Sequence, residues 1–584
     1  MFRSGFALSG LRPYLRGPLA GDLTAAVVVT IMLIPQGMAY AMLAGLPPQA
    51  GLYGAILPVL LYAVLGSSPA LAVGPVAVVA LMTAAAAGLV AETGTPGYEL
   101  AALWIALLSG AMMLVMGLFR LGFVANFLSH PVISGFITAA GILIALSQVR
   151  HLLGIQTVGK TVPEVLPSIL ANLGDVNLPT LALSVLVLAF LFWSRKGLAA
   201  LLRRLGLPRA AAAALAKGGL FLAVLVSTLA VWALSLDQAG VRILGHIPAG
   251  LPPLALPGFD LDLIMLLIVP SAMIALVGYV ESISIAQTLA AKKRQSIDPD
   301  RELVALGAAN LGAGLSQAMP VTGGLSRSIV NHEAGAETRA AGAMTAVMIG
   351  AALLALTPLL FFLPSATLAA IIIVAVVSLL DFRALPRAWS YSRADGAAMA
   401  ATMAVTLLLG VEEGLMAGVG LSLALHLYRT SRPHVAEVGQ VPGTGHFRNI
   451  NRYEVVTTPE VLTLRVDESL YFPNARYLEK LVQSRVAENP EIRHLVLMCS
   501  AVNDVDASAL ESLEMLLAKL HAAGVSLHLS EVKGPVMDRL QRTDFLQHVD
   551  GIHLTQLDAM AALAPALTEE TLNQPRCERR KALA

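Results

Sequence analysis

The amino-acid sequence predicts an all-α polytopic membrane domain of about fourteen spans, followed by a small α/β domain. Hydrophobic residues make up 56% of the 584 positions and charged residues only 13%, whereas soluble proteins are about 25% charged. Apolar stretches of about twenty residues, long enough to cross a bilayer as a helix, recur through the first three quarters of the chain. From about Arg432 onward, strand-like and helix-like segments alternate, as in an α/β domain.

Two of the predicted spans, near Val76 and Ser328, are short or interrupted by glycine and proline, and we expect each to begin inside the membrane as a half-helix. The apolar segments begin near Leu23, Gly51, Val76, Leu100, Val132, Leu181, Leu220, Leu263, Leu303, Ser328, Ala341, Ala366, Ala397 and Gly414. We therefore expect an N-terminal arm at residues 1–20, a membrane domain at 21–430, a linker at 431–457, an α/β domain at 458–565 and a tail at 566–584.

The distribution of lysine and arginine among the loops predicts the orientation in a cell membrane. Basic loops, such as residues 195–217 and 292–301, follow even-numbered spans, whereas the segment 237–262 is acidic. Because cytoplasmic loops carry an excess of positive charge, both termini are predicted to be cytoplasmic.

The two halves of the membrane domain are predicted to be inverted repeats. Gly74, in the interrupted segment 71–79, and Thr322, in the segment 320–328, are 248 residues apart (322 minus 74). Gln36 and Glu281 are separated by a similar 245 (281 minus 36). Seven spans per half is an odd number, so the second half enters the membrane with the opposite topology. Interrupted segments at corresponding positions of inverted repeats indicate the central binding site of a transporter.

The interrupted segments contain Gly74-Pro75 and Gly323-Gly324. A helix that begins inside the membrane presents free N–H groups and the positive end of its dipole. Two such helix starts facing one another suit an anion. The alternative is that the glycines only allow close helix packing. Asn310 is interpreted as a packing residue.

Two ionisable residues within apolar sequence are candidate functional groups, because charge inside a membrane is costly. Arg327 lies beside Ser326, and a guanidinium with hydroxyls suits an oxyanion. Glu281 is a candidate proton-coupling group, because protonation would remove its repulsion of the anion. A structural Arg–Glu ion pair is the alternative. Gln36 and Tyr40 share one helix face, and Gln36 is able to donate to an anion.

The remaining residues exclude several other classes. Net charge is +1, so nothing favours nucleic-acid binding. Cys499 and Cys577 have no metal-binding spacing, and we expect no metal and no cofactor. Ser508 follows a predicted strand and is a possible regulatory phosphate acceptor, although ordinary helix capping by this turn is the favoured interpretation.

Three segments resemble the SulP anion transporter family, the sulfate permeases and their animal relatives. The most specific is IPQGMAYAMLAGLPPQAGLYGAILPVLLYAVLGSSPALAVGPVAVVALM, from Ile34 to Met82. VGYVESISIAQTLA and GGLSRSIVN are similar to the eighth and tenth spans of that family. The C-terminal domain resembles a STAS domain, the module shared with anti-sigma-factor antagonists.

This resemblance implies a seven-plus-seven inverted repeat with core and gate subdomains, an elevator-like movement, a homodimer and a cytoplasmic STAS domain. Glu281 matches the acid of proton-coupled plant-type sulfate transporters. The resemblance also implies an anion site between the two half-helices, lined by Gln36, Tyr40, Val76, Leu325, Ser326 and Arg327.

The sequence thus favours sulfate:proton symport and leaves alternatives open. Sulfate and carboxylates both suit an arginine between half-helix starts, so a bicarbonate or dicarboxylate carrier remains an alternative. A membrane-tethered STAS signalling protein is disfavoured, because it leaves the intramembrane charges without a role. An ion channel is a further alternative, although Glu281 argues for coupling. No nucleophile–base set or phosphate-binding loop indicates an enzyme.

Overall fold

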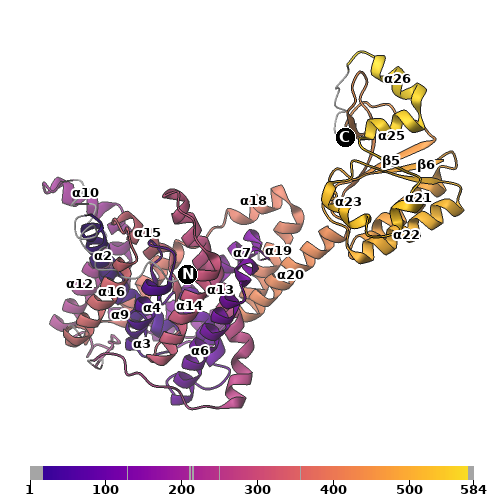
Figure 1. The fold of residues 1–584 in the computed structure, drawn as a ribbon. Coiled ribbons are helices and arrows are strands. Elements are labelled where there is room, and N and C mark those ends of the chain that lie inside the picture. Colours follow the sequence, from indigo (N-terminus) through magenta and orange to yellow (C-terminus); the bar gives the residue numbers. More distant parts are fainter. Residues whose placement is uncertain are drawn as a thin grey trace. The chain divides into compact units, whose positions relative to one another are not determined.

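A computed structural model describes residues 17–576 apart from 128, 209–211, 213–215, 217, 247, 249 and 356. The chain forms two compact units that meet in sequence at Ser422 and Leu423. The first unit is helical (Figure 1). Its main helices are α2 (Pro18–Leu43), α3 (Pro48–Tyr53), α4 (Leu57–Leu65), α5 (Ala77–Ala87), α6 (Pro96–Leu118), α7 (His130–Leu153), α8 (Val162–Ala171), α9 (Leu178–Ser194), α10 (Gly197–Arg204), α12 (Gly219–Ala233), α13 (Leu261–Lys292), α14 (Pro299–Leu315), α15 (Leu325–Glu333), α16 (Ala340–Ala355), α17 (Ser365–Val377), α18 (Ala384–Tyr391), α19 (Arg393–Leu408) and α20 (Val411–Ser431).

Every apolar segment named from the sequence lies on one of these helices, and the predicted helical membrane fold is confirmed. Among the described residues, five helical stretches are long and apolar enough to cross a membrane alone: α2, the α3–α4 stretch, α6, α7 and α13. A sixth qualifies if α9 and α10, which are bent by 69°, count as one span. Five further helices in the described part of the chain, α5, α8, α12, α16 and α17, are apolar but shorter. Fourteen spans therefore remains a prediction.

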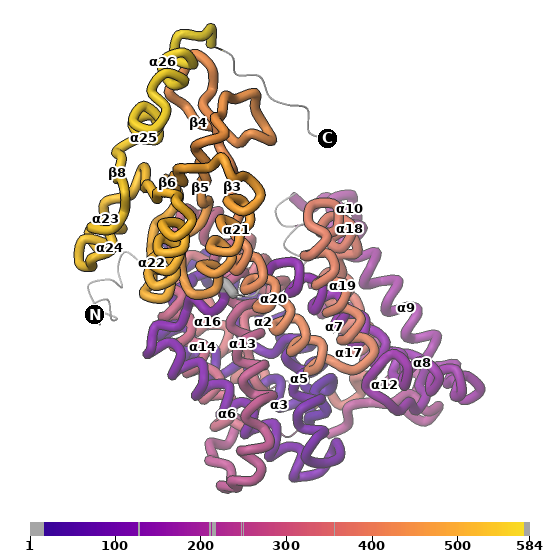
Figure 2. The backbone as a smooth tube through the Cα atoms, turned by 90° about the vertical axis from the view of Figure 1, so that its right-hand side faces the viewer, coloured from indigo at the N-terminus to yellow at the C-terminus, as the bar shows by residue number. Residues whose placement is uncertain are grey.

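Helix contacts within the first unit occur in pairs that the inverted repeat explains. α6 packs on α14, and the corresponding helices α16 and α4 also pack together. In the same way, the contact of α2 with α16 is matched by that of α13 with α6, and the contact of α7 with α19 by that of α17 with α9 (Figure 2). Together with the contacts of α3 and α15 with α2, of α5 with α6 and of α4 with α14, the first two pairs of contacts join α2–α6 and α13–α16 into one group of helices, here called the core group. The contacts of α7 with α19, of α17 with α9 and of α17 with α7 join those four helices into a second group, here called the gate group.

The second unit is a six-stranded sheet with helices on both faces (Figure 1). The strand order is β4-β3-β5-β6-β7-β8, in which β3 pairs antiparallel with both neighbours and β5 to β8 are parallel. Leu495 and Leu497 belong to the same apolar cluster as α21 and α22, whereas Val496 and Met498 face α25, because side chains alternate along a strand. The elements are β3 (Val435–Gln440), β4 (Phe447–Asn449), β5 (Val461–Val466), α21 (Ala475–Glu488), β6 (His494–Met498), α22 (Ala507–Ala522), β7 (Ser526–Ser530), α23 (Gly534–Leu540), α24 (Phe545–His548), β8 (Gly551–His553), α25 (Gln556–Leu563) and α26 (Pro565–Asn573).

The segments flanking the α/β domain are more ordered than their composition suggests. Residues 431–457, predicted as a linker, contain β3 and β4, and β3 pairs with β5. Glycine and proline around this segment obscured the strand, in which Val435 packs against the apolar cluster on one face of the sheet and Ala436 and Val438 belong to the cluster on the other. The predicted tail contributes α26. Cys499 is a buried free thiol, and Cys577 and most of the predicted arm at 1–20 lie outside the described residues.

Truncation after Arg432 should leave a folded membrane unit. The cut falls between the end of α20 and the start of β3, and each unit has its own apolar cluster. We expect the truncated protein to insert and to elute as a single species from size-exclusion chromatography in detergent. Failure to insert would argue against separable units, whereas altered transport would not.

Candidate anion site

Two short strands bring the interrupted segments together at the centre of the first unit. β1 (Val73–Gly74) pairs antiparallel with β2 (Thr322–Gly323), and Gly74 lies opposite Thr322. These are the residues that the repeat offset aligns. After each strand a helix begins: α5 begins at Ala77 and α15 at Leu325, with Val76 and Gly324 at their N-cap positions and no side chain capping either helix. Both helices therefore begin with N–H groups that no cap satisfies, at the positive ends of their dipoles.

Glycine at these positions makes room for the guanidinium of Arg327. A Cβ atom on Gly324 would lie 2.9 Å from Arg327 Nη2, and one on Gly74 would lie 3.3 Å from the same nitrogen. Arg327 is only 2% exposed, and its Nη1 donates a hydrogen bond of 2.7 Å to the carbonyl oxygen of Pro75. The arginine on one half-helix thus reaches the backbone that precedes the other.

Side chains from neighbouring helices fix β2. Asn310 of α14 accepts from the Val321 N–H and donates to the Val321 carbonyl, both at 2.9 Å. The Ser282 hydroxyl of α13 accepts from the Gly323 N–H at 2.9 Å. Asn310, interpreted from the sequence as a packing residue, is buried and has a structural role. Its amide completes the hydrogen bonding of an irregular segment, where a buried unpaired backbone group costs about 1–3 kcal/mol.

All seven side chains proposed from the sequence for the anion site and the coupling group line one pocket. α2, α5, α13 and α15 contribute Gln36, Tyr40, Val76, Glu281, Leu325, Ser326 and Arg327. The end of α17 closes another side with Ala375, Val376, Ser378 and Leu379. Sequence reasoning missed these four, because three apolar residues and one serine at a helix end look the same in a sequence as ordinary packing residues. Their position was readable only from the fold.

The polar atoms of this pocket are incompletely paired. Arg327 Nε and Nη2 and Glu281 Oε2 are buried and have no hydrogen-bond partner among the described residues. These atoms do not pair with one another, so they do not form the direct ion pair considered as the alternative from the sequence. An unpaired buried polar group is costly and calls for an explanation. A bound oxyanion would accept from both free guanidinium nitrogens and from the helix-start N–H groups.

With this geometry, the fold and site define a multi-pass membrane transport protein. A sequence model of the sulfate permease family matches residues 19–402, and a STAS domain model matches residues 452–559. The chain belongs to the sulfate permease family, as the motifs predicted. Its relatives are named as transporters, which agrees with the expectation that it is not an enzyme.

Named relatives match along most of the chain. A chloroplastic protein of Arabidopsis thaliana named sulfate transporter 4.1 is 37% identical over 541 residues, covering 90% of this chain and 77% of that protein. A probable sulfate transporter of Mycobacterium tuberculosis is 33% identical over 550 residues, covering 93% of this chain and 94% of that protein.

Solved structures share the fold at lower identity. The murine solute carrier 26 family member A9 anion transporter, in its inward-facing state, has a TM-score of 0.84 at 23% identity, with 95% of this chain and 93% of that chain covered. The transmembrane domain of the cyanobacterial bicarbonate transporter BicA has a TM-score of 0.59 at 23% identity, with 69% and 98% covered.

The substitution Gly324→Ala should impair anion uptake without unfolding the protein. The added methyl group would displace the guanidinium, whose Nη2 and Cζ atoms lie 2.9 and 3.0 Å from its position. The matched control is Gly420→Ala on α20, where an added Cβ would meet no atom within 4 Å. We expect a higher half-saturation concentration in liposome uptake for Gly324→Ala only. Equal kinetics for the two variants would contradict the close fit around Arg327.

Proposed function

We propose that this protein is a secondary active transporter of an inorganic oxyanion, with sulfate as the leading substrate and a proton as the coupling ion. The observation that carries the proposal is the pair of guanidinium nitrogens of buried Arg327 that have no hydrogen-bond partner among the described residues, beside two helix starts without a side-chain cap. This arrangement supplies several fixed donors to one pocket. The relatives named as sulfate transporters support sulfate over other oxyanions.

Glu281 is the proposed proton-coupling group. It lines the same pocket as Arg327, and its Oε2 has no hydrogen-bond partner among the described residues. When ionised, this carboxylate repels an incoming anion, and protonation removes that repulsion. Anion and proton would therefore bind together and be released together, which is the requirement for symport.

The grouping of the helices supports an elevator-like movement, which the family resemblance implies. The core group carries α5 and α15, and thus both helix starts of the anion site, whereas α17 of the gate group closes the pocket from the other side. Movement of the core group along the gate group would expose the site to each side of the membrane in turn. The β1–β2 pair would travel with the core group and keep the two helix starts together.

Cellular placement and assembly belong to the same proposal. We place the protein in the cell membrane as a homodimer, with both termini and the STAS domain in the cytoplasm, as the basic loops and the family resemblance indicate. Ser508 is exposed in the first turn of α22, beside Asp506, which caps that helix by accepting from the Ala509 N–H at 2.8 Å. It is accessible as a regulatory phosphate acceptor.

Reconstitution into proteoliposomes tests the substrate and the coupling together. Labelled sulfate, bicarbonate and fumarate are offered separately, with and without an acid-outside pH gradient. The proposal expects sulfate accumulation that depends on the gradient. Uptake of bicarbonate or fumarate in preference to sulfate would contradict sulfate as the substrate. Accumulation independent of the pH gradient would contradict the proton as the coupling ion.

Arg327→Ala should strongly weaken sulfate uptake while the protein still folds and inserts. Truncating one partner of a buried charged contact typically costs about 2–5 kcal/mol. The control is Arg387→Ala, which removes an exposed arginine of α18. We expect a large rise in half-saturation concentration for Arg327→Ala alone. An unchanged half-saturation concentration in the purified Arg327→Ala variant would refute the substrate role.

Glu281→Gln should abolish proton-driven accumulation more than it abolishes anion binding. Glutamine resembles the protonated acid in shape and neutrality, so the anion still enters, but it has no proton to release. Net uphill uptake should stop while counterflow exchange persists. Glu99→Gln, at an exposed carboxylate of α6, serves as the control. If Glu281→Gln still accumulates sulfate after an acid-outside pH step, the coupling group lies elsewhere.

A further inference from the structure

A completely buried glutamate outside the anion pocket holds the loop that leads into β1. Glu302, in the first turn of α14, is 0% exposed. Its Oε1 accepts from the Ser67 N–H and hydroxyl, both at 2.7 Å, and from the Ser68 N–H at 3.1 Å. Its Oε2 accepts from the Tyr62 hydroxyl at 2.8 Å. Four donors on one carboxylate satisfy the charge, and the start of α14 adds a favourable helix dipole.

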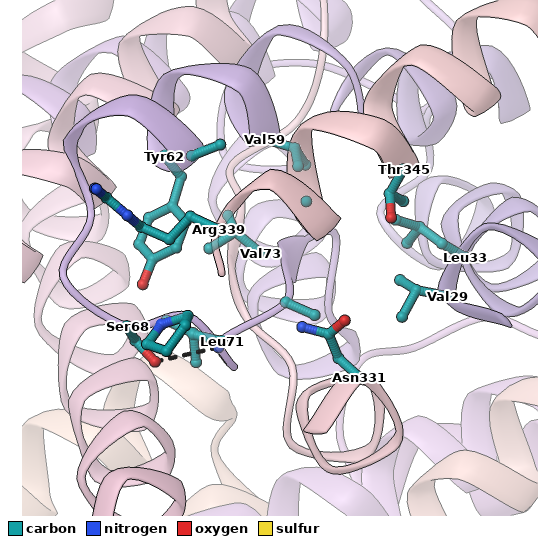
Figure 3. Close-up of a pocket in the computed structure, with 14 residues that line it drawn as sticks. Val29, Leu33, Val59, Tyr62, Ser68, Leu71, Val73, Asn331, Arg339 and Thr345 are labelled. Atoms are coloured by element: carbon teal, nitrogen blue, oxygen red, sulfur yellow. Dashed lines mark hydrogen bonds between the residues drawn. The ribbon is translucent and has the colours of Figure 1, made fainter. Parts of the chain in front are cut away.

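Two arginines bind the carbonyl groups of the same loop. Arg301 Nε donates to the Leu65 carbonyl at 2.8 Å. Arg339 Nη1 donates to the Val64 carbonyl at 3.1 Å and also to the Gly66 carbonyl. Figure 3 shows Arg339, Tyr62 and Ser68 around one small cavity, with Asn331 of α15 on its other side. At the end of α4 and in the loop after it, side chains from other segments therefore bond the carbonyl groups of residues 64–66 and the N–H groups of residues 67 and 68.

The second half-helix is connected to the same segment. On α15, the Ser328 hydroxyl accepts from the Ala72 N–H at 2.9 Å, and Asn331 Nδ2 donates to the Ala70 carbonyl at 3.1 Å. The loop after α15 is held in turn by Asp22 of α2, whose Oδ1 accepts from the Thr338 N–H at 3.0 Å. A continuous set of hydrogen bonds thus runs from α2 through both interrupted segments to the start of α14.

We infer that Glu302 is a positioning residue for the anion site, acting through the loop at 64–68 and β1 on the helix start of α5. The inference rests on the proposed function of that site. Stability alone does not require a charge here, since apolar residues in place of a buried ion pair are often neutral or stabilising. Because Glu302 Oε1 accepts hydrogen bonds from three donors of Ser67 and Ser68, it fixes the direction of the backbone that precedes β1. Binding sites need such support, because misplacement of their groups by about 0.5 Å already matters.

Two substitutions separate the effect of the length of the Glu302 side chain from the effect of its charge. Glu302→Asp keeps the charge but withdraws the carboxylate by one methylene from Ser67 and Ser68. Glu302→Gln loses the charge but keeps a carbonyl oxygen at the position of Oε1. Ser67→Ala removes a single donor and is the mildest variant. Asp260→Asn is the matched control, because Asp260 is an exposed carboxylate that caps the start of α13 away from this loop.

Hydrogen–deuterium exchange of the full-length protein, without added anion, measures whether the loop is held. Glu302→Asp should increase exchange within residues 64–79 relative to other segments, Ser67→Ala should do so to a smaller extent, and Glu302→Gln and Asp260→Asn should leave it near the unsubstituted level. Unchanged exchange in both Glu302→Asp and Ser67→Ala overturns the inference, as does an equal increase throughout the chain. This readout needs no transport, so it stands apart from a failure of the proposed function.

Sulfate binding to the same purified variants tests the consequence at the site. Glu302→Asp should raise the dissociation constant at least on the order of tenfold, the scale expected when hydrogen bonds to a charged group are lost. Glu302→Gln should restore binding to near the unsubstituted value. The inference is overturned if Glu302→Gln binds sulfate as weakly as Glu302→Asp, or if Glu302→Asp binds sulfate normally. In either case charge or simple stability, rather than positioning, explains why Glu302 is buried here. If the unsubstituted protein itself binds no sulfate, the proposed function fails while the exchange result remains valid.

Discussion

The arrangement of the membrane unit depends on one buried cation between two helix starts. The Arg327 guanidinium belongs to α15 and bonds the carbonyl of Pro75, which immediately precedes α5. Burying a charge with a single hydrogen bond is unfavourable unless another group completes its pairing. Among the described residues, Arg327 Nε and Nη2 have no hydrogen-bond partner, and an acceptor with negative charge would complete their pairing. The bare backbone of Gly74 and Gly324 allows the guanidinium to reach this position.

The inverted repeat explains why such a site exists at all. Since the two halves enter the membrane in opposite directions, their interrupted segments meet as antiparallel strands, and the helices that follow both begin beside the same pocket. If both halves had the same topology, the start of one of the two half-helices would point away from the pocket. The same repeat relates the helix contacts within each group. In the core group, the contact of α6 with α14 corresponds to that of α16 with α4, and in the gate group, the contact of α7 with α19 corresponds to that of α17 with α9. Asn310 and Ser282, outside the pocket, keep β2 in the register that this symmetry requires.

The main features of the site were predictable from the sequence because they carry chemical marks. Charge inside apolar sequence identified Glu281 and Arg327, and the glycine and proline interruptions Gly74-Pro75 and Gly323-Gly324 identified both helix starts. The supporting residues carried no such mark: Glu302 lies just after a basic loop and reads as an ordinary first-turn carboxylate, although it is completely buried. The strands β3 and β4 were hidden by glycine and proline, and their pairing with β5 depends on contacts that periodicity does not reveal.

The most direct test of the account is to locate the anion with a heavier analogue. Selenate has the charge and tetrahedral shape of sulfate, and its selenium gives an anomalous signal in crystals grown with it. The account predicts a selenium peak in the pocket between the starts of α5 and α15, with selenate oxygens within hydrogen-bonding distance of Arg327 Nε or Nη2. Selenate that competes for sulfate uptake but gives its only peak outside this pocket would contradict the account.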